Sequence, residues 1–200
     1  YYLLHSINVA TDFEDVEAQM ARNFAQVSEK CDVKQIVYLG GIANDENRSR
    51  HLLSRMNTGI ELASTSVPVL ELRAGIIIGS GSASFEMLRH LTHRLPIMTT
   101  PKWVSNRTQP IAIRDVLYYL RNAANLSQPV NRIFDIGGPE VVTYAAMMQK
   151  FSEISGLRKR IIIQVPVLTP KLSSLWIGFV TPVPTSLARP LVESLISEVV

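Results

Sequence analysis

Residues 34–41 read KQIVYLGG, a short apolar run that ends on two glycines. The central IVYL has no polar alternation, which is typical of a parallel strand buried on both faces. Glycines directly after a strand allow the backbone to approach another group closely, and ligands of open α/β sheets lie beyond the carboxyl ends of the strands. We therefore expect the functional face of the molecule at Gly40 and Gly41.

Strands and helices alternate along the chain around this segment. Apolar residues at spacings of three and four, acidic residues in the first turn and a final Lys30 predict a helix from Asp12 to Lys30. Further strands are predicted at residues 1–4, 69–78, 132–136 and 161–167, and further helices at residues 48–64, 84–95, 115–120 and after Thr143. Crossovers of this length imply parallel pairing, so we expect an α/β fold with a parallel sheet.

The composition is that of a globular protein with a substantial core. Of the 200 residues, 46% are hydrophobic, enough for one domain or for a large domain with a small appendage. The formal net charge is +3 and the basic residues are scattered. Their one cluster, RKR at residues 158–160, is interpreted as a solvated turn. We therefore expect no nucleic-acid partner.

Cysteine and histidine usage argues against several kinds of site. Cys31 is the only cysteine, which excludes an internal disulfide and a cysteine-based zinc site and fits a cytoplasmic location. His90 and His93 are far from any carboxylate pattern, so we expect no metal. The apolar residues 172–183 are too short for a membrane-spanning helix, and no signal peptide is seen, so we expect no membrane association.

Five segments, in order, carry a resemblance to a known family. They are KQIVYLGG, SRHLLSRMNTGIEL, ELRAGIIIGSGSASF, TQPIAIRDV and IFDIGGPEVVTYAAMM. Together they resemble the later two thirds of an extended short-chain dehydrogenase/reductase, the superfamily of NAD(P)-dependent sugar epimerases, dehydratases and atypical relatives. The atypical NAD(P)-binding branch is the most similar.

The resemblance implies a Rossmann-like parallel sheet with flanking helices, an NAD or NADP cofactor and a small-molecule substrate. It places residues 1–6 at the fourth strand, so that the first three strands and the glycine-rich GxxGxxG turn would precede residue 1. The absence of an initiator Met also suggests a fragment of a longer chain. Residues 1–140 would form a partial NAD(P)-binding domain with substrate loops at 80–110, and residues 141–200 a helical flap on the substrate side.

The family's chemistry uses a Tyr that exchanges a proton, a Lys four residues later, and a Ser or Thr after the preceding strand. A spacing of four places two side chains on one helix face. In the matching register, His51 replaces the Tyr, Arg55 replaces the Lys, and Gly40 or Gly41 replaces the Ser or Thr. His51 could still exchange a proton near neutral pH, and Arg55 would keep a fixed positive charge for ribose or phosphate, although Arg cannot relay protons.

The resemblance also implies the remaining site residues. Cofactor contacts are expected from His5, Ser6, Gly40, Gly41, Arg55, Ala74, Gly75 and Ile76, and substrate contacts from Ser82, Phe85, Trp103 and Gln109. Asp115 and Asp135 are interpreted as a helix cap and a strand-edge residue rather than as catalytic acids. An ordinary helix pair remains the alternative for His51 and Arg55.

These observations favour an NAD(P)-binding oxidoreductase or nucleoside-sugar epimerase-like enzyme with an altered catalytic motif. The alternative is a non-catalytic dinucleotide-binding regulatory or assembly protein, since the Tyr, Lys and Ser equivalents are all replaced. A further alternative is that these 200 residues bind no cofactor alone, because half of the dinucleotide site would be missing. Residues 1–4 would then form an unpaired sheet edge that another chain could cover, as in a homo-oligomer.

Overall fold

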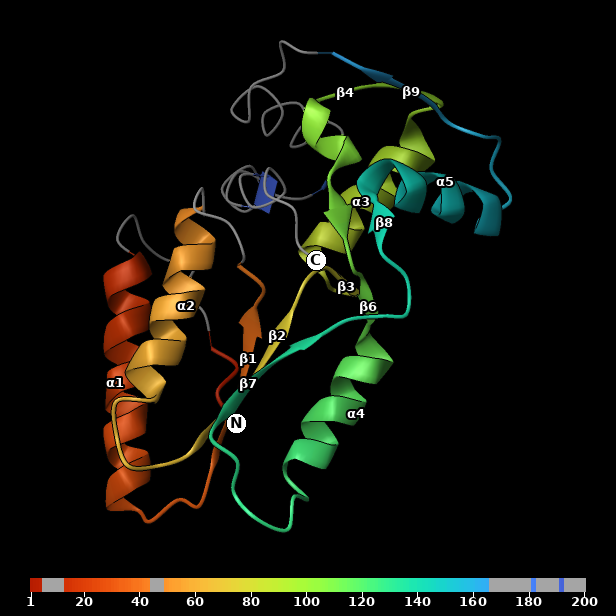
Figure 1. Ribbon diagram of the computed structural model, residues 1–200. Helices are drawn as coiled ribbons and strands as arrows, with labels where there is room; N and C mark the ends of the chain where they lie inside the picture. Colours follow the sequence, from red (N-terminus) through yellow and green to blue (C-terminus); the bar gives the residue numbers. More distant parts are fainter. Residues whose placement is uncertain (5–12, 44–48, 166–180, 183–190, 193–200) are drawn as a thin grey trace.

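The computed structural model describes residues 1–4, 13–43, 49–165, 181–182 and 191–192. Its centre is a parallel sheet in the order β1 (Ile36–Gly41), β2 (Val69–Ala74), β7 (Arg132–Ile136). The helices α1 (Phe13–Lys30) and α2 (Arg50–Leu62) cover one face, and α4 (Ile113–Ala123) covers the other (Figure 1). The predicted α/β fold with a parallel sheet and flanking helices is confirmed.

A second group of elements lies beyond the carboxyl ends of this sheet (Figure 1). These elements are β3 (Ile77–Ile78), α3 (Ala83–Arg94), β4 (Ile97–Thr100), η1 (Lys102–Ser105), β5 (Arg107–Thr108), β6 (Ile111–Ala112), β8 (Val142–Thr143), α5 (Tyr144–Ile154) and β9 (Ile161–Gln164). The helices α3 and α5 pack together there, with β4 parallel to β9, β5 antiparallel to β8, and β3 parallel to β6. The predicted domain boundary at residue 140 stays a prediction.

The strand β1 is buried on both faces, as its apolar run predicts. Ile36 and Tyr38 belong to the apolar cluster against α1 and α2, whereas Val37 belongs to the cluster against α4. Tyr2 pairs with Tyr38 as an isolated parallel bridge, and the Tyr2 amide donates to the Val37 carbonyl at 2.8 Å. The predicted strand at residues 1–4 is thus present as one bridge that extends the sheet beyond β1.

Two predicted elements differ from the structure. The strand predicted over residues 69–78 is broken at Gly75 into β2 and β3, because β3 leaves the partners of β2 and pairs with β6. The helix predicted to begin at Asp115 begins at Ile113, and its N-cap residue Ala112 makes no side-chain capping bond. Asp115 lies in the first turn, where a carboxylate favours the positive end of the helix dipole.

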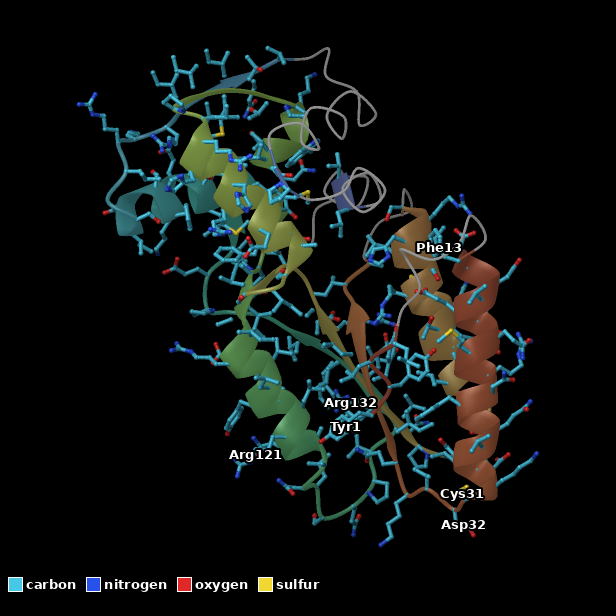
Figure 2. The ribbon with its side chains drawn as sticks, turned by 180° about the vertical axis from the view of Figure 1, so that it is seen from behind. Tyr1, Phe13, Cys31, Asp32, Arg121 and Arg132 are labelled. Atoms are coloured by element: carbon cyan, nitrogen blue, oxygen red, sulfur yellow. The ribbon has the colours of Figure 1, made fainter. Side chains whose placement is uncertain are left out.

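The N-terminal segment is also tied to the helix on the opposite face of the sheet. The Tyr1 hydroxyl donates to the Leu120 carbonyl of α4 at 3.0 Å, and Figure 2 shows Tyr1 beside the sheet near the end of α4. Cys31 and Asp32 form the turn after α1, at the end of the molecule far from the carboxyl ends of the strands (Figure 2). Cys31 is exposed as a free thiol there.

Arg160 departs from the interpretation of residues 158–160 as a solvated turn. Arg158 and Lys159 are exposed, but Arg160 is only 8% exposed. Its Nε donates to the Thr92 carbonyl at 2.7 Å, in the last turn of α3, where a cation interacts favourably with the helix dipole. The side-chain amide of Gln149 on α5 holds the main chain of Arg160 with two hydrogen bonds. Gln149 Nε2 donates to the Arg160 carbonyl at 2.6 Å, and the Arg160 amide donates to Gln149 Oε1 at 3.1 Å. Arg160 therefore links α3 to α5.

Replacing Arg160 should destabilise the protein, because the carbonyls at the end of α3 would lose a buried charged donor. We expect R160A to lower the free energy of unfolding by about 1.5–3 kcal/mol. Urea unfolding followed by circular dichroism would measure this change. R158A is the matched control at an exposed position and should be close to neutral; equal stability of the two variants would contradict the role given to Arg160.

Gly138 and Pro110 join the end of β7 to the beginning of β6. The Gly138 amide donates to the Pro110 carbonyl at 2.9 Å, and the Gln109 amide donates to the Gly138 carbonyl at 2.6 Å. A Cβ atom at position 138 would lie 2.4 Å from the Pro110 carbonyl oxygen, closer than any real contact of this kind. Only glycine therefore permits this approach of two backbones.

The Gly138→Ala variant should therefore be strongly destabilised, since a backbone carbonyl cannot move aside as a flexible side chain can. We expect its free energy of unfolding to fall by about 1–3 kcal/mol. Gly41→Ala is the matched control, because a Cβ there would meet only Leu52 Cδ2 at an ordinary 3.5 Å. A calorimetric melting temperature of G138A equal to that of G41A would show that the close approach does not constrain the fold.

Candidate functional site

A cavity of about 290 Å³ lies at the carboxyl ends of β1 and β2. Its walls come from both strand ends, from α2, and from the first turns of α3 and α5. Seven of the residues expected from the sequence line this one cavity: Gly40, Gly41, His51, Arg55, Ala74, Gly75 and Ile76. The structure therefore brings together residues from three segments that are well separated in the chain.

The other expected site residues have different surroundings. His5 and Ser6 lie outside the described residues. Ser82 is the N-cap of α3 and accepts from the Phe85 amide at 3.4 Å. Phe85 lines a separate groove of about 720 Å³ between α3 and α5, where its ring meets Phe151 edge-on. Their roles as substrate contacts stay predictions.

Trp103 and Gln109 also lie away from the lining of this cavity. The Trp103 ring packs edge-on against Tyr144, with 5.8 Å between the ring centroids. Gln109 donates to the Gly138 carbonyl, so its side chain holds the connection between β6 and β7. A substrate contact by either residue stays a prediction. In the structure, both side chains pack against or bond to other parts of the protein.

The position of α2 follows from its own sequence. Ser49 caps the helix by accepting from the Leu52 amide at 3.3 Å, so the helix begins at Arg50 and its first turn faces the strand ends. Leu52 is buried and packs beside Gly41, where a Cβ atom would lie at an ordinary 3.5 Å from Leu52 Cδ2. His51 and Arg55, four residues apart, then lie on one helix face toward the cavity.

Arg55 makes an unusual set of contacts at the base of this cavity. Its guanidinium donates to the Leu4 carbonyl at 3.1 Å and to the Leu39 carbonyl. Its Cζ lies 4.9 Å from the centre of the Tyr38 ring, and the Tyr38 hydroxyl donates to the Arg55 carbonyl at 2.8 Å. Burial strongly raises the pKa of Tyr38, so this hydroxyl stays protonated and able to donate.

Two polar lining residues were not identified from the sequence. Ser84 lies in the first turn of α3, and Tyr144 is the first residue of α5 and only 4% exposed. Burial raises the pKa of Tyr144 to about 12, so its hydroxyl is neutral at physiological pH. The Thr143 cap, which accepts from the Ala146 amide at 3.1 Å, predicted the start of α5. That this start faces the cavity depends on how α5 packs against α3, which no local pattern encodes.

The cavity combines a glycine-rich floor, apolar walls and four polar side chains: His51, Arg55, Ser84 and Tyr144. Such a lining suits a flat, partly apolar group with hydrogen-bonding edges. Within the described parts of the chain there is no cluster of three or more side chains that could bind a metal ion. No helix in those same parts is long and apolar enough to cross a membrane.

Comparison with known proteins identifies the fold. No family model matches the sequence, and no curated protein matches it either. Among solved structures, the chain is similar to an NADPH-dependent quinone oxidoreductase from Escherichia coli, complexed with NADPH, at a TM-score of 0.71 and 17% identity, covering 96% of this chain and 62% of that one. A second similar structure is a nucleoside-diphosphate-sugar epimerase from Staphylococcus aureus, with a TM-score of 0.71 and 12% identity. That match covers 97% of this chain and 65% of the epimerase.

A UDP-glucuronic acid 4-epimerase from Bacillus cereus, in complex with NAD, gives a TM-score of 0.65 and 11% identity, covering 99% of this chain and 72% of that one. The chain spans less than two thirds of the length of the quinone oxidoreductase and of the Staphylococcus aureus epimerase. At these identities the likeness concerns the fold. The chain has the Rossmann-like α/β fold that these solved structures share.

Proposed function

We propose that the protein binds NAD or NADP and acts on a small-molecule substrate as an oxidoreductase or a nucleoside-sugar epimerase-like enzyme with an altered catalytic motif. The observation that carries this proposal is the cavity at the ends of β1 and β2, which gathers His51, Arg55 and the glycine-rich floor. Support also comes from the fold, since similar structures are complexes with NADPH and with NAD.

The lining fits the nicotinamide half of a dinucleotide. A cavity of about 290 Å³ has room for only part of such a cofactor, since ligand pockets usually span about 300–1,000 Å³. Gly41 leaves space for a flat ring, and the Ala74-Gly75-Ile76 backbone lines the same cavity. The described residues include no GxxGxxG turn for the pyrophosphate. When bound, a nicotinamide ring supplies hydride transfer.

The chain's own side chains would handle protons and orientation. His51 is the group that can gain or lose a proton near neutral pH, and it lines the cavity one turn before Arg55. The neutral hydroxyls of Ser84 and Tyr144 can donate hydrogen bonds to a substrate oxygen. We assign His51 as the acid–base residue and these two hydroxyls to orienting the substrate.

A second candidate is a non-catalytic dinucleotide-binding regulatory or assembly protein. The contacts of Arg55 favour it, because a guanidinium bonded to two main-chain carbonyls is unlike the lysine that the family uses beside its tyrosine. A cytoplasmic location fits the exposed free thiol of Cys31. A homo-oligomer remains part of the proposal, since residues 1–4 meet the sheet through a single bridge.

Dinucleotide binding is the direct test. We expect the full-length protein to bind NADPH or NADH saturably in isothermal titration calorimetry. Gly41→Val should weaken this binding about tenfold or more, since its methyl groups would enter the cavity. The control is Ala63→Val at the exposed end of α2, which should bind as wild type. No heat with either dinucleotide, reduced or oxidised, would refute the proposed function.

His51 separates the two candidates. If the protein is an enzyme, His51→Gln should lower turnover about 10²–10⁴-fold, because the cavity loses its proton donor, while the Kd for NADPH stays unchanged. Turnover is measured as NADPH oxidation with a soluble quinone and, separately, as conversion of a UDP-sugar. His90→Gln on α3 is the matched control and should keep full turnover. NADPH binding without turnover in wild type would favour the regulatory candidate. Equal turnover in both variants would contradict the acid–base role assigned to His51.

A further inference from the structure

We infer that Arg55 is a positioning residue that holds two neighbouring strand ends together beneath the cavity, and that it is not the cation that holds the ribose of a dinucleotide. The matching register with the family would give Arg55 the ribose-holding role. The contacts of its guanidinium point to a different role. This inference rests on the proposed function for its binding measurement only.

The pairing between residues 1–4 and β1 is short. Main-chain pairing consists of the Tyr2–Tyr38 bridge, with the Tyr2 amide donating to the Val37 carbonyl at 2.8 Å. Beyond this bridge, Leu4 is 54% exposed. The next bonds that connect the two segments come from Arg55, whose Nη1 donates to the Leu4 carbonyl at 3.1 Å and whose Nη2 donates to the Leu39 carbonyl. Within the described residues 1–4, one side chain of α2 thus connects the segment to β1 beyond the Tyr2–Tyr38 bridge.

Tyr38 fixes both ends of this arginine. The fully buried Tyr38 ring lies under the guanidinium, with 4.9 Å from Cζ to the ring centre, a favourable cation–π contact. The same residue donates its hydroxyl to the Arg55 carbonyl at 2.8 Å. The next residue of β1, Leu39, accepts from the guanidinium. The main chain and the side chain of Arg55 are therefore both held by β1.

The chemistry of the guanidinium explains why arginine suits this role. Two carbonyls on neighbouring strands require donors that diverge from one planar group, and a guanidinium provides them. A lysine ammonium is a single point of charge on a flexible stem, and it would reach one carbonyl but not hold both in fixed geometry. By contrast, lysine is the residue with which the family itself binds the cofactor ribose. Arg55→Lys therefore separates the two roles.

The test combines amide hydrogen exchange with dinucleotide titration. In the ligand-free full-length protein, we expect R55K to accelerate exchange about tenfold or more in the peptides that cover residues 1–4 and 36–41, because the clamp on the strand ends is lost. NADPH affinity, followed by nucleotide fluorescence, should also fall about tenfold or more. Arg22→Lys is the matched control, since Arg22 pairs with Glu61 across α1 and α2 on the exposed side and should change neither measurement.

Tyr38→Phe is a second variant that keeps the ring under the guanidinium and removes the hydroxyl that donates to the Arg55 carbonyl. It should accelerate exchange in the same peptides by a smaller factor, which a ribose contact by Arg55 would not explain. Unchanged exchange in ligand-free R55K, or NADPH affinity in R55K equal to or tighter than wild type, would overturn the inference. If wild type binds no dinucleotide, the proposed function fails, and the exchange measurement alone decides whether Arg55 is a clamp.

Discussion

The parallel ladder between β1 and β2 is the constraint on which the cavity depends. Its register pairs Ile36 with Val69 and Gly41 with Ala74, so both strands end at the same level. The glycine end of β1 then lies beside the turn at Gly75, where the chain leaves the sheet. A register slip of one residue would turn every side chain of β1 to the opposite face. The apolar clusters on both faces of β1 oppose such a slip.

Three of the polar side chains buried between this sheet and the helices α1 and α2 are paired. Ser54 of α2 donates to the buried Glu17 of α1, and Glu71 of β2 pairs with Arg73 at 2.8 Å. Burying such groups is costly unless their hydrogen bonds are made. Pairing at fixed positions therefore favours one arrangement of α2 on the sheet, and the direction in which His51 faces depends on that arrangement.

Much of the fold could be predicted from local patterns, and the failures have a common cause. The apolar run at residues 36–39, the apolar spacing of α1 and the Thr143 cap each encode an element within a few residues, and the structure contains all three. The buried role of Arg160 has no local signal, because its partner Thr92 is 68 residues away. The break at Gly75 depends on β6, and the approach of Tyr144 to the cavity depends on the packing of α5. Long-range contacts of this kind leave no local signal.

In the candidate site, too, local patterns predict some features, and long-range contacts decide the others. The resemblance identified residues on α2 and at the strand ends, and the structure places seven of them around one cavity. The expected substrate contacts lie in loops whose position depends on tertiary packing, and in the structure Gln109 instead bonds to Gly138.

The two hydrogen bonds between Gln109-Pro110 and the loop after β7 have a mechanical consequence. They join the sheet to the elements beyond its carboxyl ends at this point, so these parts should unfold as one cooperative unit when denaturant is applied.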